Sequence, residues 1–252
     1  MTWLLTLAFD GTEYCGFQVQ PNGRSVAAAF QDALEAVIGF RPDIKGCSRT
    51  DAGVHALGFA LSFEADLRIP PEKLPLALNT KLPRDIRVLS ARVVPDGFHA
   101  RYAAHTKTYL YRIHNSAIDS PFEERYYCRI PGRLDVARMQ QAAAGFVGTH
   151  DFLALCAAHS SAAAHGDTVR TITACGVERH GDTVEITVTA DGYLYNMVRI
   201  LAGTLCEAGA GRLDPAAVPA ILASRDRKNA GPTLPAKGLF LHHVDYGKEA
   251  EG

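Results

Sequence analysis

The sequence predicts an α+β fold made of two ferredoxin-like βαββαβ halves. Runs with the alternation of strands and runs with the spacing of helices follow one another in the order β, α, β, β, α, β, and the same order then occurs a second time. Two such halves can join their antiparallel sheets and leave a central active-site cleft between them. We expect this arrangement here.

The first half is expected over residues 1–104. A helix should begin after Ser25, a good N-cap residue, and end at Gly39. A second helix should start at Pro70-Pro71 and be kinked or shortened by Pro75, because proline donates no backbone hydrogen bond. Strands are predicted at 3–9, 43–48, 57–64 and 86–94.

The second half is expected over residues 105–247, with a tail at 248–252. Asp135 should cap a helix, and His180-Gly181-Asp182 should turn a hairpin. Strands are predicted at 107–113, 171–179, 183–190 and 238–246, and helices at 136–147, 196–209 and 215–224.

Composition limits the possible functions. The chain has 252 residues, 47% of them hydrophobic, and a net charge of −1, so we expect a globular protein that does not coat nucleic acid by bulk charge. Its six cysteines include no C-x-x-C pair, which argues against a zinc ribbon and a disulfide framework. No run approaches the roughly 18 apolar residues of a membrane helix, and the N-terminus lacks the basic region of a signal peptide. The sequence predicts a cytoplasmic protein with no membrane partner.

One part of this neutral chain is basic. From Lys81 to Arg112 there are seven Lys or Arg residues against two acidic ones, interleaved with Phe98, Tyr102, Tyr109 and Tyr111. Cations can hold phosphates while aromatic rings stack on bases, so the stretch favours RNA binding. An ordinary solvated strand face is the alternative.

The stretch GCSRTDAGVHA, residues 46–56, has more than a turn requires. Asp51-Ala52-Gly53 alone would satisfy turn chemistry, because Asp bonds its own backbone and Gly accepts a positive φ. Arg49 and Thr50 have no part in that. A loop held by a strand at each end is also stiff enough to position a carboxylate.

Six stretches together resemble one family. They are FDGTEYCGFQVQ, GCSRTDAGVHA, FHARYAAHTKTYLYR, GTHDF, GYLYNMVR and AGPTLPAKGLFL. In this order they resemble the tRNA pseudouridine synthase A family, from about Leu7 to Tyr246. The resemblance implies the pseudouridine synthase fold and an isomerase that converts uridine to pseudouridine in the anticodon stem-loop of tRNA. It also implies a homodimer with each tRNA lying across both subunits, and no metal, nucleotide or other cofactor.

The resemblance assigns site residues by position. Asp51 is the catalytic carboxylate, which either attacks C1′ of the ribose or removes the C2′ proton. Arg49 supports the extruded nucleotide, Tyr109 lies against the target base, and Arg199 pairs with Asp51. The segment DGYLYN just upstream of Arg199 supplies Leu194 as an expected wall of the pocket. From the residues alone, Asp51 could be a turn residue, Tyr109 or Tyr111 a core aromatic, and Arg199 a cation that snorkels from a helix end.

The chain departs from the family pattern at a few positions, none of which is a predicted site residue. It has Cys47-Ser48 where the family has a small residue and Gly, and Phe9 and Phe17 where the family has Tyr and Trp. Lys107 replaces an Arg and Tyr193 a common Phe. These departures bear on the breadth of substrates rather than on activity.

Three alternatives remain from the sequence. The same isomerisation could act on another RNA site, or a noncatalytic RNA-binding protein could use the same fold. A metal-dependent hydrolase could use Asp51, His55 and His99 or His150 as ligands, although no H-x-x-x-H spacing or cluster of carboxylates supports it.

Overall fold

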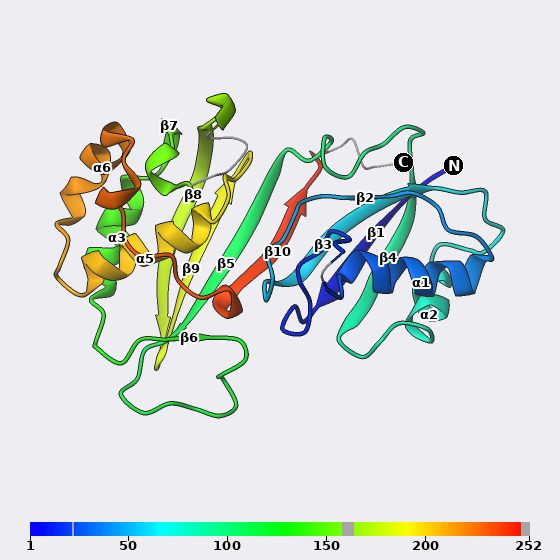
Figure 1. The fold of residues 1–252 in the computed structure, drawn as a ribbon, viewed down its shortest axis with the longest axis horizontal. Coiled ribbons are helices and arrows are strands. Elements are labelled where there is room, and N and C mark those ends of the chain that lie inside the picture. Colours follow the sequence, from blue (N-terminus) through cyan, green and yellow to red (C-terminus); the bar gives the residue numbers. More distant parts are fainter. Residues whose placement is uncertain (22, 158–163, 248–252) are drawn as a thin grey trace. The chain divides into compact units, whose positions relative to one another are not determined.

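The computed structural model describes residues 1–21, 23–157 and 164–247 (Figure 1). Within these ranges the chain forms two compact units. Unit 1 is Met1–Thr106 together with the chain from Phe240 onwards, and unit 2 is Lys107–Leu239. Both combine helices with strands that pair mostly antiparallel, which confirms the α+β class. The predicted tail at 248–252 lies outside the described residues.

Unit 1 has the βαββαβ order that the sequence predicts. In its sheet β4, β1 and β3 are neighbours and pair antiparallel. β2 pairs with β3 at Leu61–Phe63, and β10 runs parallel to β3 at His55 and Ala56. The elements are β1 Thr2–Phe9, α1 Val26–Ile38, β2 Ile44–Gly46, β3 His55–Glu64, α2 Leu74–Asn79, β4 Ile86–Val94 and β10 Leu239–Asp245.

Local sequence explains the helices of unit 1. The Ser25 hydroxyl accepts the Ala28 N–H at 3.2 Å, and Gly39 ends α1 in the left-handed region at φ 84°, as predicted. The predicted start of the second helix was wrong, although a short helix does run through the predicted region. The chain from Pro70 forms a turn, and α2 begins only at Leu74 with Pro75 in its first turn. A proline there costs nothing, because the first N–H groups of a helix have no partner within it.

The core of unit 1 lies between β1, β3 and α1. Its largest fully buried side chains alternate along the strands and recur on one face of the helix, while other buried residues such as Leu4 and Ser62 occupy the other face of the strands. They are Trp3, Leu5 and Leu7 of β1, Phe30 and Leu34 of α1, Phe59, Leu61 and Phe63 of β3, and Leu74 of α2.

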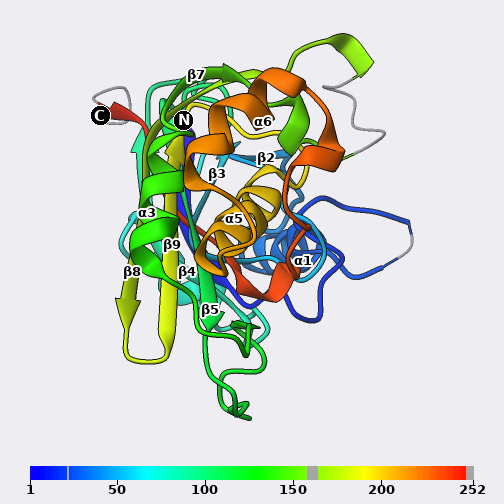
Figure 2. The same ribbon diagram turned by 90° about the vertical axis from the view of Figure 1, so that its left-hand side faces the viewer.

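Unit 2 contains a four-stranded antiparallel run in the order β5-β9-β8-β7, and β6 runs parallel to β5. Helices α3 and α5 pack against each other, and α3 also packs on β8. The elements are β5 Thr106–His114, β6 Cys128–Arg129, α3 Val136–Ala144, β7 Gly148–Asp151, β8 Val169–His180, β9 Thr183–Ala190, α5 Met197–Gly209 and α6 Val218–Ser224. Figure 2 shows α3, α5 and α6 of this unit from the side.

Two features of unit 2 bear on the prediction. The hairpin turns at Gly181 with φ 62°, and Asp135 caps α3 by accepting the N–H groups of Ala137 and Arg138, both as expected. Strand β7 was not predicted, because GTHDF lacks a strand's apolar alternation.

The joined sheets, the cleft and the division at residues 104 and 105 stay predictions. In the described ranges, no helix combines the length and apolar character needed to span a membrane.

Candidate active site

Asp51 lies in the loop between β2 and β3 of unit 1, which we call the carboxylate loop (residues 47–54). The loop begins where the Cys47 N–H donates to the Ala60 carbonyl at 2.8 Å, and it turns where the Val54 N–H donates to the Asp51 carbonyl at 3.2 Å. Gly53 takes φ 76° inside this turn. Asp51 is half-buried and Arg49, two residues earlier, is exposed. The loop therefore contains the turn expected at Asp51-Ala52-Gly53, and it also holds the Asp51 side chain in a half-buried position.

A segment from the start of the chain braces the carboxylate loop. The Phe17 N–H donates to the Thr50 carbonyl at 3.4 Å, and the Gly53 N–H donates to the Tyr14 carbonyl at 3.2 Å. Gly16 has φ 95°, and a Cβ there would lie 2.2 Å from the Thr50 oxygen. The stretch FDGTEYCGFQVQ thus has a physical role, since it fixes the backbone on both sides of Asp51.

A second brace joins the end of the same loop to the segment that follows β1. A Cβ at Gly11 would lie 1.9 Å from the Val54 carbonyl oxygen, so only glycine fits at this approach. The Gly11 N–H donates to Nδ1 of His55 at 3.0 Å, and the His55 ring stacks on Phe240 with 4.7 Å between centroids. His55 is 1% exposed. These contacts make His55 a buried structural residue and weaken the hydrolase alternative.

Unit 2 contributes a pair of tyrosines. Tyr109 packs edge-to-face on Tyr193, with ring centroids 4.8 Å apart and an angle of 82°. The Tyr193 hydroxyl lies 2.7 Å from the Lys107 carbonyl oxygen and 2.8 Å from that of Val188, and either can accept its proton. Burial raises the pKa of Tyr193 well above its usual value, so this hydroxyl stays a donor. Tyr193 stands where the resemblance has a Phe, and its additional hydroxyl bonds the side chain to β5 and β9.

Tyr109 and Tyr111 have different environments. Tyr111 is fully buried, and its hydroxyl donates to the Pro235 carbonyl at 2.7 Å. A Cβ at Gly238 would lie 2.9 Å from its ring. Both tyrosines are buried: Tyr111 is fully enclosed and tied to Pro235, whereas Tyr109 is 6% exposed and packs on Tyr193. Leu194, next in the chain, is 5% exposed and has the apolar character expected of a wall.

Arg199 lies in the first turn of α5 and is half-buried. Its Nε donates to the Leu234 carbonyl at 2.7 Å, and its Nη1 donates to the Asn196 side-chain oxygen at 2.7 Å. A side chain that snorkels into solvent would be held by no such pair of bonds. The guanidinium is fixed from two directions within unit 2.

The segment that supplies the Leu234 carbonyl lies tightly on α5; we call it the strap (residues 230–235). A Cβ at Gly203 would lie 1.9 Å from the Pro232 oxygen, and one at Gly231 would lie 2.4 Å from the Thr204 nitrogen. The Gly231 N–H also donates to the Thr204 hydroxyl at 2.9 Å. The stretch AGPTLPAKGLFL therefore has a structural reason, because its small residues let the strap approach α5 and present a carbonyl to Arg199.

The predicted site residues divide between the units. Arg49 and Asp51 share the carboxylate loop of unit 1. In unit 2, Tyr109 belongs to β5, Leu194 to the segment before α5, and Arg199 to α5. Sequence reasoning missed Asn196 and Gly16. The only signal for Asn196 was its place at the start of a helix, which indicates an ordinary N-cap. The only signal for Gly16 was a glycine in a loop.

The basic stretch is less uniform than the sequence suggests. Lys107 is buried, Arg112 donates through Nε to Glu185 at 3.0 Å, and Arg87 donates to the carbonyls of Pro83 and Ile86. Arg101 lies near the Tyr102 ring, and Tyr102 is 78% exposed. Arg101 and Tyr102 are therefore placed for phosphate contact and base stacking, and three further cations of the stretch are also exposed: Lys81, Arg84 and Arg92.

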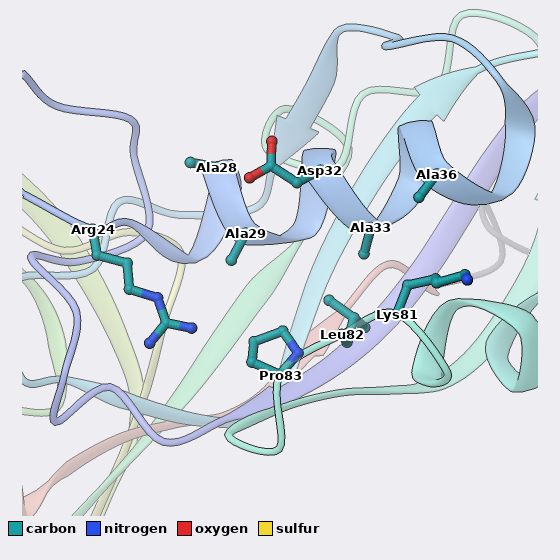
Figure 3. A pocket seen from close by; sticks show the side chains of 9 residues that line it. All are labelled: Arg24, Ala28, Ala29, Asp32, Ala33, Ala36, Lys81, Leu82 and Pro83. Atoms are coloured by element: carbon teal, nitrogen blue, oxygen red, sulfur yellow. The ribbon is translucent and has the colours of Figure 1, made fainter.

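A groove of about 480 Å³ lies along α1 in unit 1 (Figure 3). Alanines of α1 form one side, with Arg24 and Lys81 near it. It contains none of the five predicted site residues. In the part of the chain that the structure describes, no three His, Cys, Asp or Glu side chains gather in a way that could hold a metal ion.

Comparison with known proteins gives a consistent result. The family described as tRNA pseudouridine synthase matches residues 6–103 and 142–247, ranges that include all the predicted site residues except Tyr109. A tRNA pseudouridine synthase A of Moorella thermoacetica is 46% identical over 244 residues, which cover 96% of this chain and 98% of the relative. Those of Caldicellulosiruptor saccharolyticus and Bacillus pumilus are each 42% identical, over 243 and 245 residues. These alignments cover 96% of this chain and 98% and 97% of the two relatives.

Proposed function

The chain belongs to the tRNA pseudouridine synthase family, and we propose that it isomerises uridine to pseudouridine in the anticodon stem-loop of tRNA, with Asp51 as the catalytic carboxylate. The match of the family to residues 6–103 and 142–247 is the observation on which this proposal mainly rests. The rigid carboxylate loop supports it, because a braced backbone holds a carboxylate in one place without the substrate.

The reaction exchanges one bond of the base for another. The bond from C1′ to N1 breaks, the uracil turns, a bond from C1′ to C5 forms, and the hydrogen of C5 leaves while N1 gains one. Atoms and electrons balance without an oxidant, water or nucleotide. Attack on C1′ and removal of the C2′ proton both need an ionised carboxylate, and Asp51 supplies it.

The remaining residues would act on the nucleotide. A stacked uridine hides its ribose, so the base must leave the stem at a cost of a few kcal/mol. We assign Arg49, exposed on the carboxylate loop, to support of the extruded nucleotide. Tyr109 would lie against the base with Leu194 as a wall, and Arg199 would keep Asp51 ionised, since a nearby cation lowers the pKa of a carboxyl group.

The assembly and the location belong to the same proposal. We expect a homodimer that binds each tRNA across both subunits, and we place the reaction in the cytoplasm. The relatives' names specify tRNA, which supports tRNA as the substrate.

The test labels tRNA with tritium at C5 of its uridines, so that release of label reports isomerisation. Wild type should release it without added metal or nucleotide. Asp51→Asn keeps the size of the side chain and an acceptor oxygen but removes the charge, so tRNA affinity should survive while the rate falls by about three orders of magnitude or more. Asp66→Asn, at an exposed carboxylate of the same unit, is the matched control and should react like wild type.

Two results would contradict the proposal. Near wild-type release by Asp51→Asn would return Asp51 to the role of a turn residue. Binding of tRNA by the wild type with no release of label would favour a noncatalytic RNA-binding protein. Mapping of pseudouridine in tRNA from cells with and without the protein then identifies the uridine, and a site outside the anticodon stem-loop would correct the proposed position.

A further inference from the structure

Asn196, the residue before α5, has an unusual backbone. Its φ of 61° and ψ of 7° place it in the left-handed region, which among the described non-glycine residues only Arg225 shares. An N-cap residue normally has extended backbone and accepts a hydrogen bond from the helix through its side chain. Asn196 makes no such cap bond. Asparagine tolerates the left-handed region better than most residues that carry a Cβ, and here it adopts that region without giving the helix the usual cap bond.

The side chain of Asn196 has a different partner. An ordinary N-cap Asn would accept the backbone N–H of the third helical residue, which here is Arg199. Instead its oxygen accepts from the Arg199 guanidinium, at Nη1, over 2.7 Å. With this left-handed backbone, the Asn196 amide points to the Arg199 side chain instead of to the Arg199 backbone N–H.

The strap completes the arrangement from the other side. The Leu234 carbonyl accepts from Nε of Arg199 at 2.7 Å, and the Leu234 N–H donates to the Arg199 carbonyl at 3.3 Å. Two acceptors on different edges of a planar guanidinium fix both its position and its plane. One is a backbone atom that no substitution removes, and the other is the side chain of Asn196.

We propose that Asn196 is a positioning residue for the reaction, which sets the direction of the Arg199 guanidinium at the cost of capping α5. This inference rests on the proposed function and names a residue that acts on the site through Arg199. It accounts for the left-handed backbone, the missing cap bond and the bond to the guanidinium with one role.

Asn196→Gly tests this role with little penalty in folding. Glycine adopts the left-handed region readily and there is no cap bond to lose, but the bond to Arg199 is lost, so the melting temperature should stay close to that of wild type. The amide acceptor for Nη1 disappears, and kcat for tritium release should fall by about 10- to 100-fold, as expected when a catalytic group is misplaced by about 1 Å. KM for tRNA should stay within about twofold, because a positioning role affects the chemical step.

Asp135→Gly is the matched control, since it makes the same change at the N-cap of α3 in the same unit. Asp135 does cap its helix, by accepting from Ala137 and Arg138 at 2.9 and 3.2 Å. Its replacement should leave kcat unchanged and lower the melting temperature only slightly, because glycine is itself a tolerated N-cap residue, so the contrast with Asn196→Gly lies in kcat. A cap role for Asn196 would instead make the two variants alike.

A second pair of variants tests the path through Arg199. In a background of Arg199→Ala the guanidinium is gone, so adding Asn196→Gly should slow the reaction no further. Losses that multiply, or an Asn196→Gly enzyme with wild-type kcat, would overturn the inference. Failure of the wild type to release tritium would instead refute the proposed function, so the two failures are distinguishable.

Discussion

Substitution of Gly16 by alanine should damage catalysis from a distance. Gly16 is not one of the predicted site residues, but it lies against the backbone of Thr50, the residue before Asp51. A Cβ at this position would lie 2.2 Å from the Thr50 carbonyl oxygen, whereas ordinary contact begins at 3.4 Å. The two groups must therefore separate by about 1 Å, and the close packing around them leaves little room for this without moving the carboxylate loop.

The size of the effect follows from this displacement. A left-handed alanine costs about 1 to 2 kcal/mol, and overpacking adds about 1 to 3 kcal/mol, so the free energy of unfolding should fall by about 2 to 5 kcal/mol. This is less than the roughly 5 to 15 kcal/mol typical of a domain, and most molecules should stay folded. A shift of about 1 Å at a catalytic group costs about 100-fold in rate, which is the loss expected in kcat.

The assay combines tritium release, tRNA binding and thermal unfolding, with Gly39→Ala as the control. Gly39 has φ 84°, close to the 95° of Gly16, but a Cβ there meets nothing within 4 Å. It should therefore lose about 1 to 2 kcal/mol of stability and no activity. Equal rates for the two variants would refute the reasoning, because strain without displacement would then account for both.

The remaining predictions concern the substrate and the assembly. Arg225 and Lys228 are both exposed, and Arg225 pairs with Asp151 at 3.1 Å. If Lys228 contacts a phosphate and Arg225 exchanges its ion pair for one, tRNA affinity should fall steeply with salt, and Arg225→Ala with Lys228→Ala should reduce the log-log slope by about one unit per lost contact, equally for all tRNAs. An unchanged slope would show that these cations are only solvated surface. Arg227 is left intact because it donates to Ala230 and Thr233 in the strap. Sedimentation should give the mass of two chains, and an active monomer at the same dilution would contradict the homodimer.

The sequence predicted most elements because their signals are local. Ser25 and Gly39 mark the ends of α1 through bonds to residues a turn away, and β1 is a short run of mostly apolar residues that are mostly buried. Pro75 misled the prediction because a proline within a helix and one in its first turn look alike without the register of the helix. Tyr109 and Tyr111 could not be told apart by alternation, since the difference depends on Pro235, which is distant in the chain.

The residues that hold the site could be predicted only in part. Asp51 and Arg199 stand in recognisable stretches, but the bonds that orient them come from elsewhere in the chain. Asn196 has the sequence signal of an N-cap, and only the dihedral angles show that its side chain serves Arg199. Gly16 could be predicted as a turn residue, while its contact with Thr50 is a property of the folded backbone.

The close glycine contacts of the strap and the carboxylate loop limit how this protein can be made more heat-resistant. Replacing glycine by alanine usually stabilises a fold by about 0.4 to 1 kcal/mol, because it restricts the unfolded chain, provided that the backbone and the space permit a Cβ. Gly132 and Gly176 meet both conditions, with no positive φ and nothing within 4 Å. Gly11, Gly203 and Gly231 lack the space, and no flexible neighbour can yield to a Cβ, since their close contacts are backbone atoms. A thermostable variant must therefore keep glycines whose importance only the folded backbone reveals.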